Sequence, residues 1–293
     1  MMNFDGYTQA LKAAAEPTRL RLLVLCARGE LSVSDLVAVL GQSQPRVSRH
    51  LKVLCDAGLL ERYRDGHWVL FRVPLVGPGA DLVHRLLDPL DSNDPQLAPD
   101  KRRLEVLLGE QQPAAVDPML RRFNRLLLSY FLTQPVGELL DIGVGSGAVL
   151  KLLAQRATQA VGIDVDSASR QAARRELLRS GLQHCSIRSG DMHALEFDDD
   201  TFDTVILDEV LMQSDQPANV LREAMRVLRG SGRLLIVEHQ AREQVASAID
   251  LIKTLAQQAR LPIGSFRRSA DNHLEYLVAE GLRGSAQQGR RPA

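Results

Sequence analysis

A glycine-rich turn follows the first strongly apolar strand of the C-terminal half of the chain. The segment 139–148 reads LLDIGVGSGA, with Gly143, Gly145 and Gly147 in the turn and Asp141 directly before them. Glycine lets backbone approach a ligand closely, and the helix that follows offers free N–H groups to it. The turn therefore predicts a site for a nucleotide-like cofactor, to which all four residues contribute.

Two further acids end the next two predicted strands. Asp164 precedes Val165, and Asp191 precedes Met192. Open α/β sheets bind ligands at the carboxyl ends of their strands, so these acids should lie at one edge with the glycine turn. We expect Asp164 to bind ribose hydroxyls and Asp191 to accept a hydrogen bond from an adenine amino group, with Val165 and Met192 as walls.

The glycine spacing alone leaves the cofactor type open. Gly143-x-Gly145-x-x-Ala148 also satisfies the dinucleotide fingerprint, with Asp164 near the distance expected for an acid that binds NAD ribose. However, Asp141 would repel a pyrophosphate, whereas it can bind an ammonium group. This difference favours an S-adenosyl ligand over NAD.

From Glu138 onward, apolar strands alternate with helical segments, which predicts a parallel α/β sheet. The expected strands are Glu138–Ile142, Ala160–Asp164, Cys185–Ser189, Thr204–Leu207, Arg233–Glu238, Leu261–Arg267 and His273–Ala279. With the runs FDDDTFDTVILDEVLM and PANVLREAMRVLRGSGRLLIVE, this half of the chain resembles the class I S-adenosylmethionine-dependent methyltransferases. The resemblance implies a Rossmann-like fold with a seven-strand sheet, which binds S-adenosylmethionine or S-adenosylhomocysteine.

The reactive side of the predicted cofactor site departs from that family. Families that fuse such a domain to a repressor carry Trp in the helix before the glycine turn and His after the fourth strand. Here the expected helix Asp117–Thr133 has no Trp, and Met212 stands where the His is expected. Asp208 is predicted to bind the cofactor, near its methyl group. Asp208, Glu209 and Gln213 could act there as general bases, and the alternative is that they are solvated residues at a helix start. No catalytic residue is assigned.

A second constellation lies in the N-terminal third, where a helix predicted over Gln44–Ala57 has an apolar face and a polar face. Val47, Leu51 and Leu54 fall on one side and predict its core contacts. Arginine forms paired hydrogen bonds with guanine and glutamine with adenine, so the polar face could bind DNA. The alternative interpretation is that this face is charged and only solvated. The residues predicted to contact DNA from this helix are Gln44, Arg46, Ser48, Arg49 and Lys52.

The next segment predicts a β-hairpin, since Leu60–Tyr63 and Trp68–Val73 alternate around Asp65-Gly66. Arg62, Arg64 and His67 would lie on this wing and contact DNA. Residues 44–72 contain six basic residues, Arg72 included, and three acidic ones, so this segment has a net positive charge. The whole chain has 36 basic and 36 acidic residues and no net charge.

The stretches AEPTRLRLLVLC and LSVSDLVAVLGQSQPRVSRHLKVLCDAGLLERYRDGHWVLFRV resemble the ArsR/SmtB-type winged-helix repressors. The resemblance implies a homodimer on double-stranded, palindromic operator DNA, with helix Asp81–Leu87 in the dimer interface. The family's metal-binding CxC is Ser32-Val33-Ser34 here, and serine does not replace thiolate. Asp81 and His84 also have the wrong spacing for the family's other metal site, so no metal is expected.

The remaining composition predicts a cytoplasmic protein. The chain has three cysteines without CxxC spacing, no apolar run long enough for a membrane span and no signal-peptide pattern. A linker rich in proline and aspartate follows the wing. We expect a winged helix-turn-helix domain at 1–90, linker and connecting helices at 91–134, the S-adenosyl-binding domain at 135–284 and a flexible tail at 285–293.

Two functions follow from this organisation. In the first, the chain is a repressor whose methyltransferase-like domain binds the S-adenosyl ligand as an effector; the resemblance implies control of methionine-cycle genes. In the second, the domain is an active small-molecule methyltransferase that the DNA-binding part regulates. The absent Trp and His favour the first function.

Overall fold

The computed structural model describes residues 2–91, 94–109, 135–270 and 274–283. Contacts divide the chain into two units, residues 1–112 with 177–184, and residues 113–176 with 185–293. The predicted helix Asp117–Thr133 and the predicted tail lie outside the described residues. The domain boundaries predicted from the sequence stay predictions.

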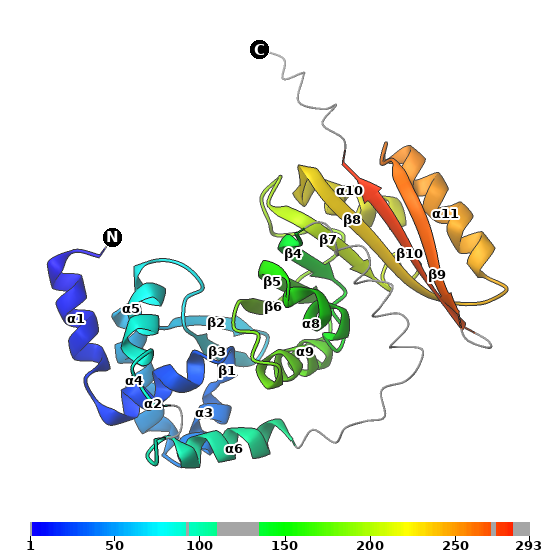
Figure 1. Cartoon of the computed structure of the whole chain (residues 1–293). Helices are drawn as coiled ribbons and strands as arrows, with labels where there is room; N and C mark the ends of the chain where they lie inside the picture. The colour runs from blue at the N-terminus through cyan, green and yellow to red at the C-terminus, as the bar shows by residue number, and fades with distance from the viewer. Residues whose placement is uncertain (1, 92–93, 110–134, 271–273, 284–293) are drawn as a thin grey trace. The chain divides into compact units, whose positions relative to one another are not determined.

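The first unit combines short helices with a small antiparallel sheet (Figure 1). Its strands run in the order β1–β3–β2. The elements are α1 (Phe4–Ala14), α2 (Pro17–Cys26), β1 (Leu31–Ser32), α3 (Val33–Leu40), α4 (Gln44–Asp56), β2 (Glu61–Asp65), β3 (Trp68–Arg72), α5 (Pro78–Leu87) and α6 (Ala98–Leu108). The predicted helix-turn-helix and hairpin are confirmed. Strand β1 was not predicted, because a strand of two residues shows no alternation of apolar and polar positions.

Local signals explain where the helix-turn-helix begins and turns. Ser32 caps α3 in a capping box with Asp35, which satisfies N–H groups that have no partner within the helix. Gly41 then ends α3 with a left-handed φ of 63°, a conformation that glycine adopts without strain. Ser43 precedes α4, which has Pro45 in its first turn.

Helix α6 belongs to the core of this first unit. Leu104 and Leu108 are buried in the same apolar cluster as Leu36 and Leu51. The Arg21 guanidinium of α2 donates two hydrogen bonds of 2.6 Å to the buried carboxylate of Asp100. This bidentate pair holds α6 against α2.

The second unit contains a seven-stranded sheet in the order β6–β5–β4–β7–β8–β10–β9. The first five strands are parallel, and β10 pairs antiparallel with both β8 and β9. The strands are β4 (Gly137–Ile142), β5 (Ala157–Asp164), β6 (Cys185–Ser189), β7 (Phe202–Asp208), β8 (Leu228–Ala241), β9 (Ile263–Ala270) and β10 (Leu274–Leu282). The predicted α/β class and seven-strand sheet are confirmed, although β8 begins at Leu228 rather than at the predicted Arg233.

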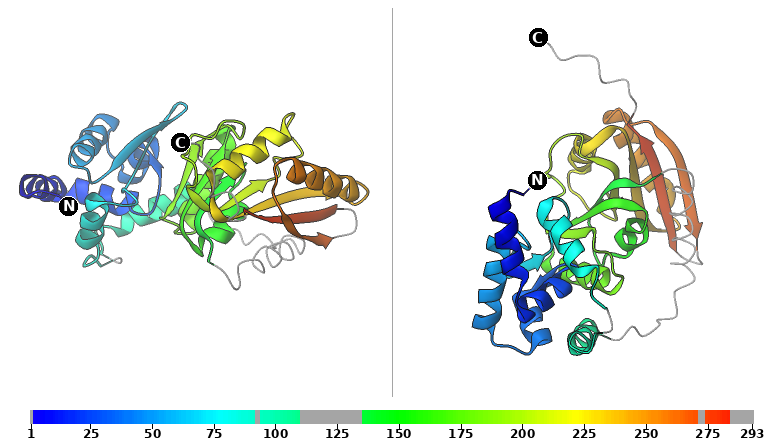
Figure 2. Two further views of the ribbon diagram at one scale, coloured as in Figure 1. Left: turned by 90° about the horizontal axis from the view of Figure 1, so that it is seen from above. Right: turned by 60° about the vertical axis from the view of Figure 1, so that its left-hand side comes forward.

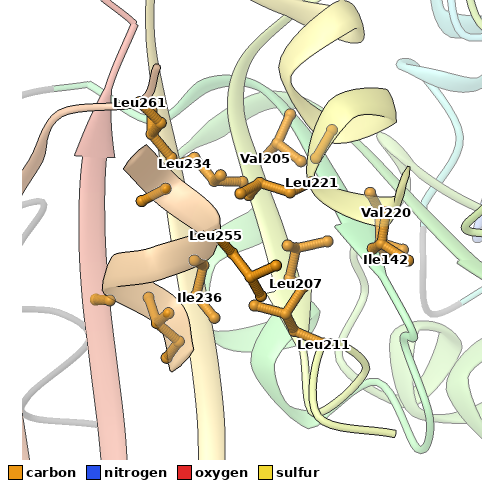
Figure 3. Packing of buried hydrophobic residues seen from close by; sticks show 14 of the residues in the cluster. Ile142, Val205, Leu207, Leu211, Val220, Leu221, Leu234, Ile236, Leu255 and Leu261 are labelled. Atoms are coloured by element: carbon orange, nitrogen blue, oxygen red, sulfur yellow. The ribbon is translucent and has the colours of Figure 1, made fainter. Parts of the chain in front are cut away.

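Four helices of this unit pack beside the strands: α8 (Ala148–Ala154), α9 (Ser167–Arg179), α10 (Pro217–Val227) and α11 (Val245–Gln258). Figure 2 shows α11 alongside the β8–β10–β9 part of the sheet. Figure 3 shows Leu221 of α10 and Leu255 of α11 packed with Leu207 and Ile236 of the strands. This apolar layer fixes the strands whose carboxyl ends carry the predicted site.

Candidate functional site

A cavity of about 520 Å³ opens at the carboxyl ends of β4, β5, β6 and β7. Its lining includes the predicted residues Gly143, Gly145, Asp164, Val165, Asp191, Met192 and Asp208. It also includes Ile142, Ile163, Gly190, His193, Glu209, Val210 and Gln213. The folded chain thus brings together residues that are more than sixty positions apart in the sequence.

The glycine turn is held in place by the neighbouring strand. The N–H groups of Gly143 and Val144 both donate to the carbonyl of Ile163, at 2.9 and 3.0 Å. Gly143 has a φ of 82°, and a Cβ there would lie 2.8 Å from the carbonyl oxygen of Asp208. Glycine is therefore required for the turn to pass close to the end of β7.

Gly147 lies at the end of the glycine turn, beside α9. It begins α8 with a φ of 82°, and a Cβ there would lie 3.1 Å from the Cα of Ala173 in α9. It does not line the cavity. The structure therefore gives Gly147 a packing contact between two helices.

Asp164 and Asp191 each organise the loop that follows their strand. Asp164 Oδ2 accepts a hydrogen bond of 3.0 Å from the Gly145 N–H, and Oδ1 accepts one of 2.8 Å from the Asp166 N–H. Asp191 Oδ1 accepts a hydrogen bond of 2.8 Å from the His193 N–H. Each carboxylate oxygen has a second lone pair, so both acids can still accept a hydrogen bond from a ligand.

Asp141 lies buried beneath the glycine turn and does not line the cavity. It has 0% exposure, and within the part of the chain that the structure describes no side chain pairs with either of its carboxylate oxygens, although the backbone N–H of Leu150 acts to lower its pKa. Burial raises the pKa of Asp141 to about 7, and the negative charge of Asp164 adds to the effect. A buried carboxylate that no side chain neutralises is costly, so a cationic group brought near it by a ligand would be stabilising.

Two more acids, Asp208 and Glu209, line the β7 end of the cavity, and a third, Glu238, lies close enough for its charge to act on Asp208. Burial and the charge of Asp141 raise the pKa of Asp208 well above its ordinary value. Burial also raises the pKa of Glu238, which is 2% exposed, to about 7, with the charge of Glu209 adding to it. Glu209 has a φ of 56°, a left-handed conformation that is costly for a residue with a side chain.

Met212 occupies the position where the methyltransferase resemblance implies a histidine. Its backbone N–H donates a 3.1 Å hydrogen bond to Glu238 Oε1, and its side chain packs against the apolar core. A thioether offers no proton for acid–base chemistry. Met212 therefore binds Glu238 through its backbone, and its side chain offers no base.

His193 is a cavity residue that sequence reasoning missed. Its Nδ1 is buried without a hydrogen-bond partner, and its Nε2 lies 3.9 Å from Asp215. The only signal for His193 in the sequence is its place two residues after Asp191. Val210 was missed as well. Both residues reach the cavity through turns, which hydrophobic periodicity does not predict.

Helix α4 presents the predicted polar face. Val47, Leu51 and Leu54 are buried in the core of the first unit. Gln44, Arg46, Arg49 and Lys52 are exposed, and Ser48 is half-buried. Lys52 Nζ pairs with Asp56 at 2.8 Å.

The hairpin of β2 and β3 exposes Arg62, Arg64 and His67. Arg72 differs, because it lies over the Tyr63 ring at 5.7 Å and pairs with Glu61 at 3.1 Å and Glu30 at 3.5 Å. Arg72 is therefore held by ion pairs within the fold, whereas the side chains of Arg62, Arg64 and His67 are exposed.

Ser32, which stands where the resembled family has a metal-binding cysteine, stabilises the start of α3. The Ser32 side chain caps α3 by accepting from the Asp35 N–H at 3.1 Å. Within the described ranges, no group of three or more His, Cys, Asp or Glu side chains could hold a metal ion. No described helix is long and apolar enough to cross a membrane.

Comparisons with known proteins match the two parts of the chain separately. Residues 16–62 match the family described as "Bacterial regulatory protein, arsR family", and residues 140–236 match the family described as "Methyltransferase domain". The arsenic resistance transcriptional regulator ArsR1 of Pseudomonas putida is 41% identical over 107 residues, which cover 36% of this chain and 81% of that protein.

Another relative matches over a similar length. A phosphatidylethanolamine N-methyltransferase of Cereibacter sphaeroides is 35% identical over 109 residues, which cover 37% of this chain and 53% of that protein. The chain thus spans about half the length of this methyltransferase.

Solved structures match this chain at low sequence identity. The N-methyltransferase NodS of Bradyrhizobium japonicum has a TM-score of 0.49 at 21% identity, covering 62% of this chain and 96% of that chain. The YcgJ protein of Bacillus subtilis has a TM-score of 0.49 at 15% identity, covering 56% of this chain and 99% of that chain. The family matches, together with the winged helix and the sheet, show that this chain belongs to the arsR family of bacterial regulatory proteins and carries a methyltransferase domain.

Proposed function

We propose that this chain is a cytoplasmic transcriptional repressor whose methyltransferase domain binds S-adenosylmethionine or S-adenosylhomocysteine as an effector. The observation that carries the proposal is the fully buried carboxylate of Asp141, which no side chain among the described residues neutralises, beneath a glycine turn at the edge of a ligand-sized cavity. Both ligands carry an ammonium group that would offset this charge. Asp164 and Asp191 line the same cavity, and in this proposal they accept hydrogen bonds from ribose and adenine.

The DNA-binding part of the proposal rests on α4 and the wing. The exposed side chains of Gln44, Arg46 and Arg49 extend from a helix whose opposite face is buried. Such a helix can enter the major groove, where Arg and Gln form paired hydrogen bonds with guanine and adenine. Ser48, Lys52, Arg62, Arg64 and His67 would contact the remaining bases and the phosphates.

An exposed apolar stripe on α1 supports the proposal that the chain binds a palindromic operator as a homodimer. Phe4, Tyr7 and Leu11 lie at helical spacing and are 84%, 48% and 38% exposed. A second copy of the chain would bury this stripe around a twofold axis, together with α5. Twofold symmetry in the protein requires related half-sites in the DNA.

Ligand binding changes DNA affinity if the ligand binds one geometry of the dimer better than the other. Control of methionine-cycle or other methyl-cycle genes would make such a response useful, because these genes set the supply of both ligands.

A second candidate function is methyl transfer to a small molecule, with the DNA-binding part regulating the operon. The acids Asp208 and Glu209, which line the cavity, favour it, as does the match to a phosphatidylethanolamine N-methyltransferase. The packed Met212 side chain opposes it.

The test is calorimetric titration of the full chain with S-adenosylmethionine, S-adenosylhomocysteine and NAD, alone and with DNA selected by the protein from a random pool. The proposal predicts that an S-adenosyl ligand binds, that NAD does not, and that bound DNA changes the ligand affinity. Equal ligand affinity with and without DNA would exclude the effector role and leave the enzyme. Binding of NAD alone would exclude both functions.

A further inference from the structure

An exposed arginine of α6 lies beside the turn of the helix-turn-helix. Helix α6 contacts α3 within the first unit (Figure 1). The Arg103 Nη1 group donates a hydrogen bond of 3.0 Å to the carbonyl of Val39, in the last turn of α3. A Cβ placed on Gly41 would lie 3.7 Å from the same nitrogen. The Arg103 guanidinium therefore borders the turn that joins α3 to α4.

The positive charge of Arg103 is not offset where it lies. Among the described residues its one ion pair is with the buried Asp100, at 3.7 Å. Both oxygens of Asp100 already accept hydrogen bonds of 2.6 Å from Arg21. One carboxylate between two guanidiniums leaves one positive charge. The Arg103 side chain is 51% exposed and that of Arg21 is 24% exposed, so the remaining charge faces solvent mainly at Arg103.

The turn beside Arg103 leads into the end of α4 that enters the DNA groove in the proposed complex. Gln44 begins α4 three residues after Gly41, a span of at most about 11 Å. Recognition helices contact base edges with their N-terminal residues. The major groove is about 12 Å wide, and a sugar–phosphate backbone runs along each rim. A side chain at the turn is therefore close to one rim when Gln44 reaches the bases.

The chemistry of Arg103 suits a phosphate at that rim. A guanidinium has five N–H donors, so donors remain beyond the bond to Val39. Arginine binds phosphate oxygens through paired, charge-assisted hydrogen bonds.

We propose that Arg103 binds a DNA phosphate at the rim of the major groove, so that α6 adds a contact to those of α4 and the wing. This inference rests on the proposed function, because it requires that α4 enters the groove. The part of the chain that matches the arsR family ends at residue 62, so the match does not include α6. A phosphate contact adds affinity for DNA of any sequence and carries no base preference of its own.

The experiment measures how salt changes DNA binding by the full chain. Fluorescence anisotropy gives the dissociation constant for DNA selected by the protein from a random pool, at several salt concentrations. Each phosphate contact contributes about 0.9 to the slope of the logarithm of affinity against the logarithm of salt concentration. Arg103→Gln should therefore reduce the slope by about 0.9 for each bound chain, or about 1.8 for a homodimer. For the homodimer, the loss of affinity between about 50 and 200 mM salt should be about tenfold smaller than in the wild type.

Two variants separate the charge of Arg103 from its position. Arg103→Lys keeps the charge and should keep the wild-type slope. Lys101→Gln is the matched control, because Lys101 is an exposed cation of the same helix that lies about 200° around the helix axis from Arg103. It should leave the slope unchanged. If Arg103→Gln does not fold, Arg103→Met, which keeps the apolar stem, carries the test.

A wild-type slope in Arg103→Gln would overturn the phosphate contact and leave the proposed function standing. This holds even if the variant binds more weakly at every salt concentration, since loss of the bond to Val39 changes the turn without changing the number of phosphates that are neutralised. Failure of the wild type to bind any DNA from the pool would overturn both proposals.

Discussion

Asp164 Oδ2 accepts a hydrogen bond of 3.0 Å from the Gly145 N–H, which joins the end of β5 to the glycine turn after β4. The same carboxylate accepts from the Asp166 N–H through its other oxygen. Asp164 therefore has two functions in the proposed site, because it holds the turn and faces the cavity where ribose would lie.

Asp164→Ala should weaken binding of S-adenosylmethionine by about ten- to a hundredfold, since a hydrogen bond to a charged group contributes about 1.5–3 kcal/mol. Titration calorimetry measures the change. Asp166→Ala removes a neighbouring acid that does not line the cavity and serves as the control. Unchanged affinity in Asp164→Ala would exclude the ribose contact.

Arg49→Ala should abolish binding to DNA selected by the wild-type protein, and it should leave ligand affinity unchanged. The reason is that Arg49 is exposed on α4, opposite the buried Leu51 and Leu54. Fluorescence anisotropy with labelled DNA measures the loss. Lys101→Ala, which removes an exposed cation of α6, is the control. If Arg49→Ala still binds the DNA, the face of α4 has been assigned wrongly.

Arg21→Ala should destabilise the first unit by about 2 kcal/mol, because it leaves the buried carboxylate of Asp100 without its main partner. Chemical unfolding followed by the fluorescence of Trp68, the single tryptophan of the chain, reports on this unit.

Arg102→Ala removes an exposed arginine from the same helix and should change stability little. If Arg21→Ala unfolds at the same denaturant concentration as Arg102→Ala, the ion pair does not hold α6 in place.

The stability of the ligand-free protein should fall as the pH rises from about 4 to about 7. The pKa of Asp141 is raised from 3.8 to about 7, so in this range the folded protein binds a proton that the unfolded protein does not. The stabilisation by this proton is complete below the unfolded pKa and is lost as the pH rises through the folded pKa. Glu238, raised from 4.5 to about 7, acts in the same direction.

Asp141→Asn should flatten this dependence without removing it, because Glu238 still titrates. Thermal unfolding at several pH values measures the slope for the wild type and the variant. An identical slope in both would show that Asp141 has no shifted pKa.

The sequence predicted the repeating features of the fold because they have periodic causes. The order of apolar strands alternating with helical segments and the buried face of α4 both follow from geometry that a sequence pattern exposes. The glycine turn and the acids at the strand ends were also visible, since those residue types are rare in buried strands.

Features that depend on packing between distant segments were not visible in the sequence. The assignment of Gly147 to helix packing depends on Ala173 of α9, and the neutralisation of Arg72 depends on Tyr63 and two acids. The cavity residues His193 and Val210 lie on turns whose path is set by tertiary contacts. That no described side chain pairs with the buried carboxylate of Asp141 likewise becomes visible only in the structure.

The most direct test of the account measures DNA affinity of the full chain with and without a saturating S-adenosyl ligand, by anisotropy with DNA selected by the protein. The account predicts that S-adenosylmethionine changes the dissociation constant by about tenfold or more, a coupling of about 1.4 kcal/mol or more. Asp164→Ala should abolish the change at the same ligand concentration. A dissociation constant that is the same with and without bound ligand would contradict the account.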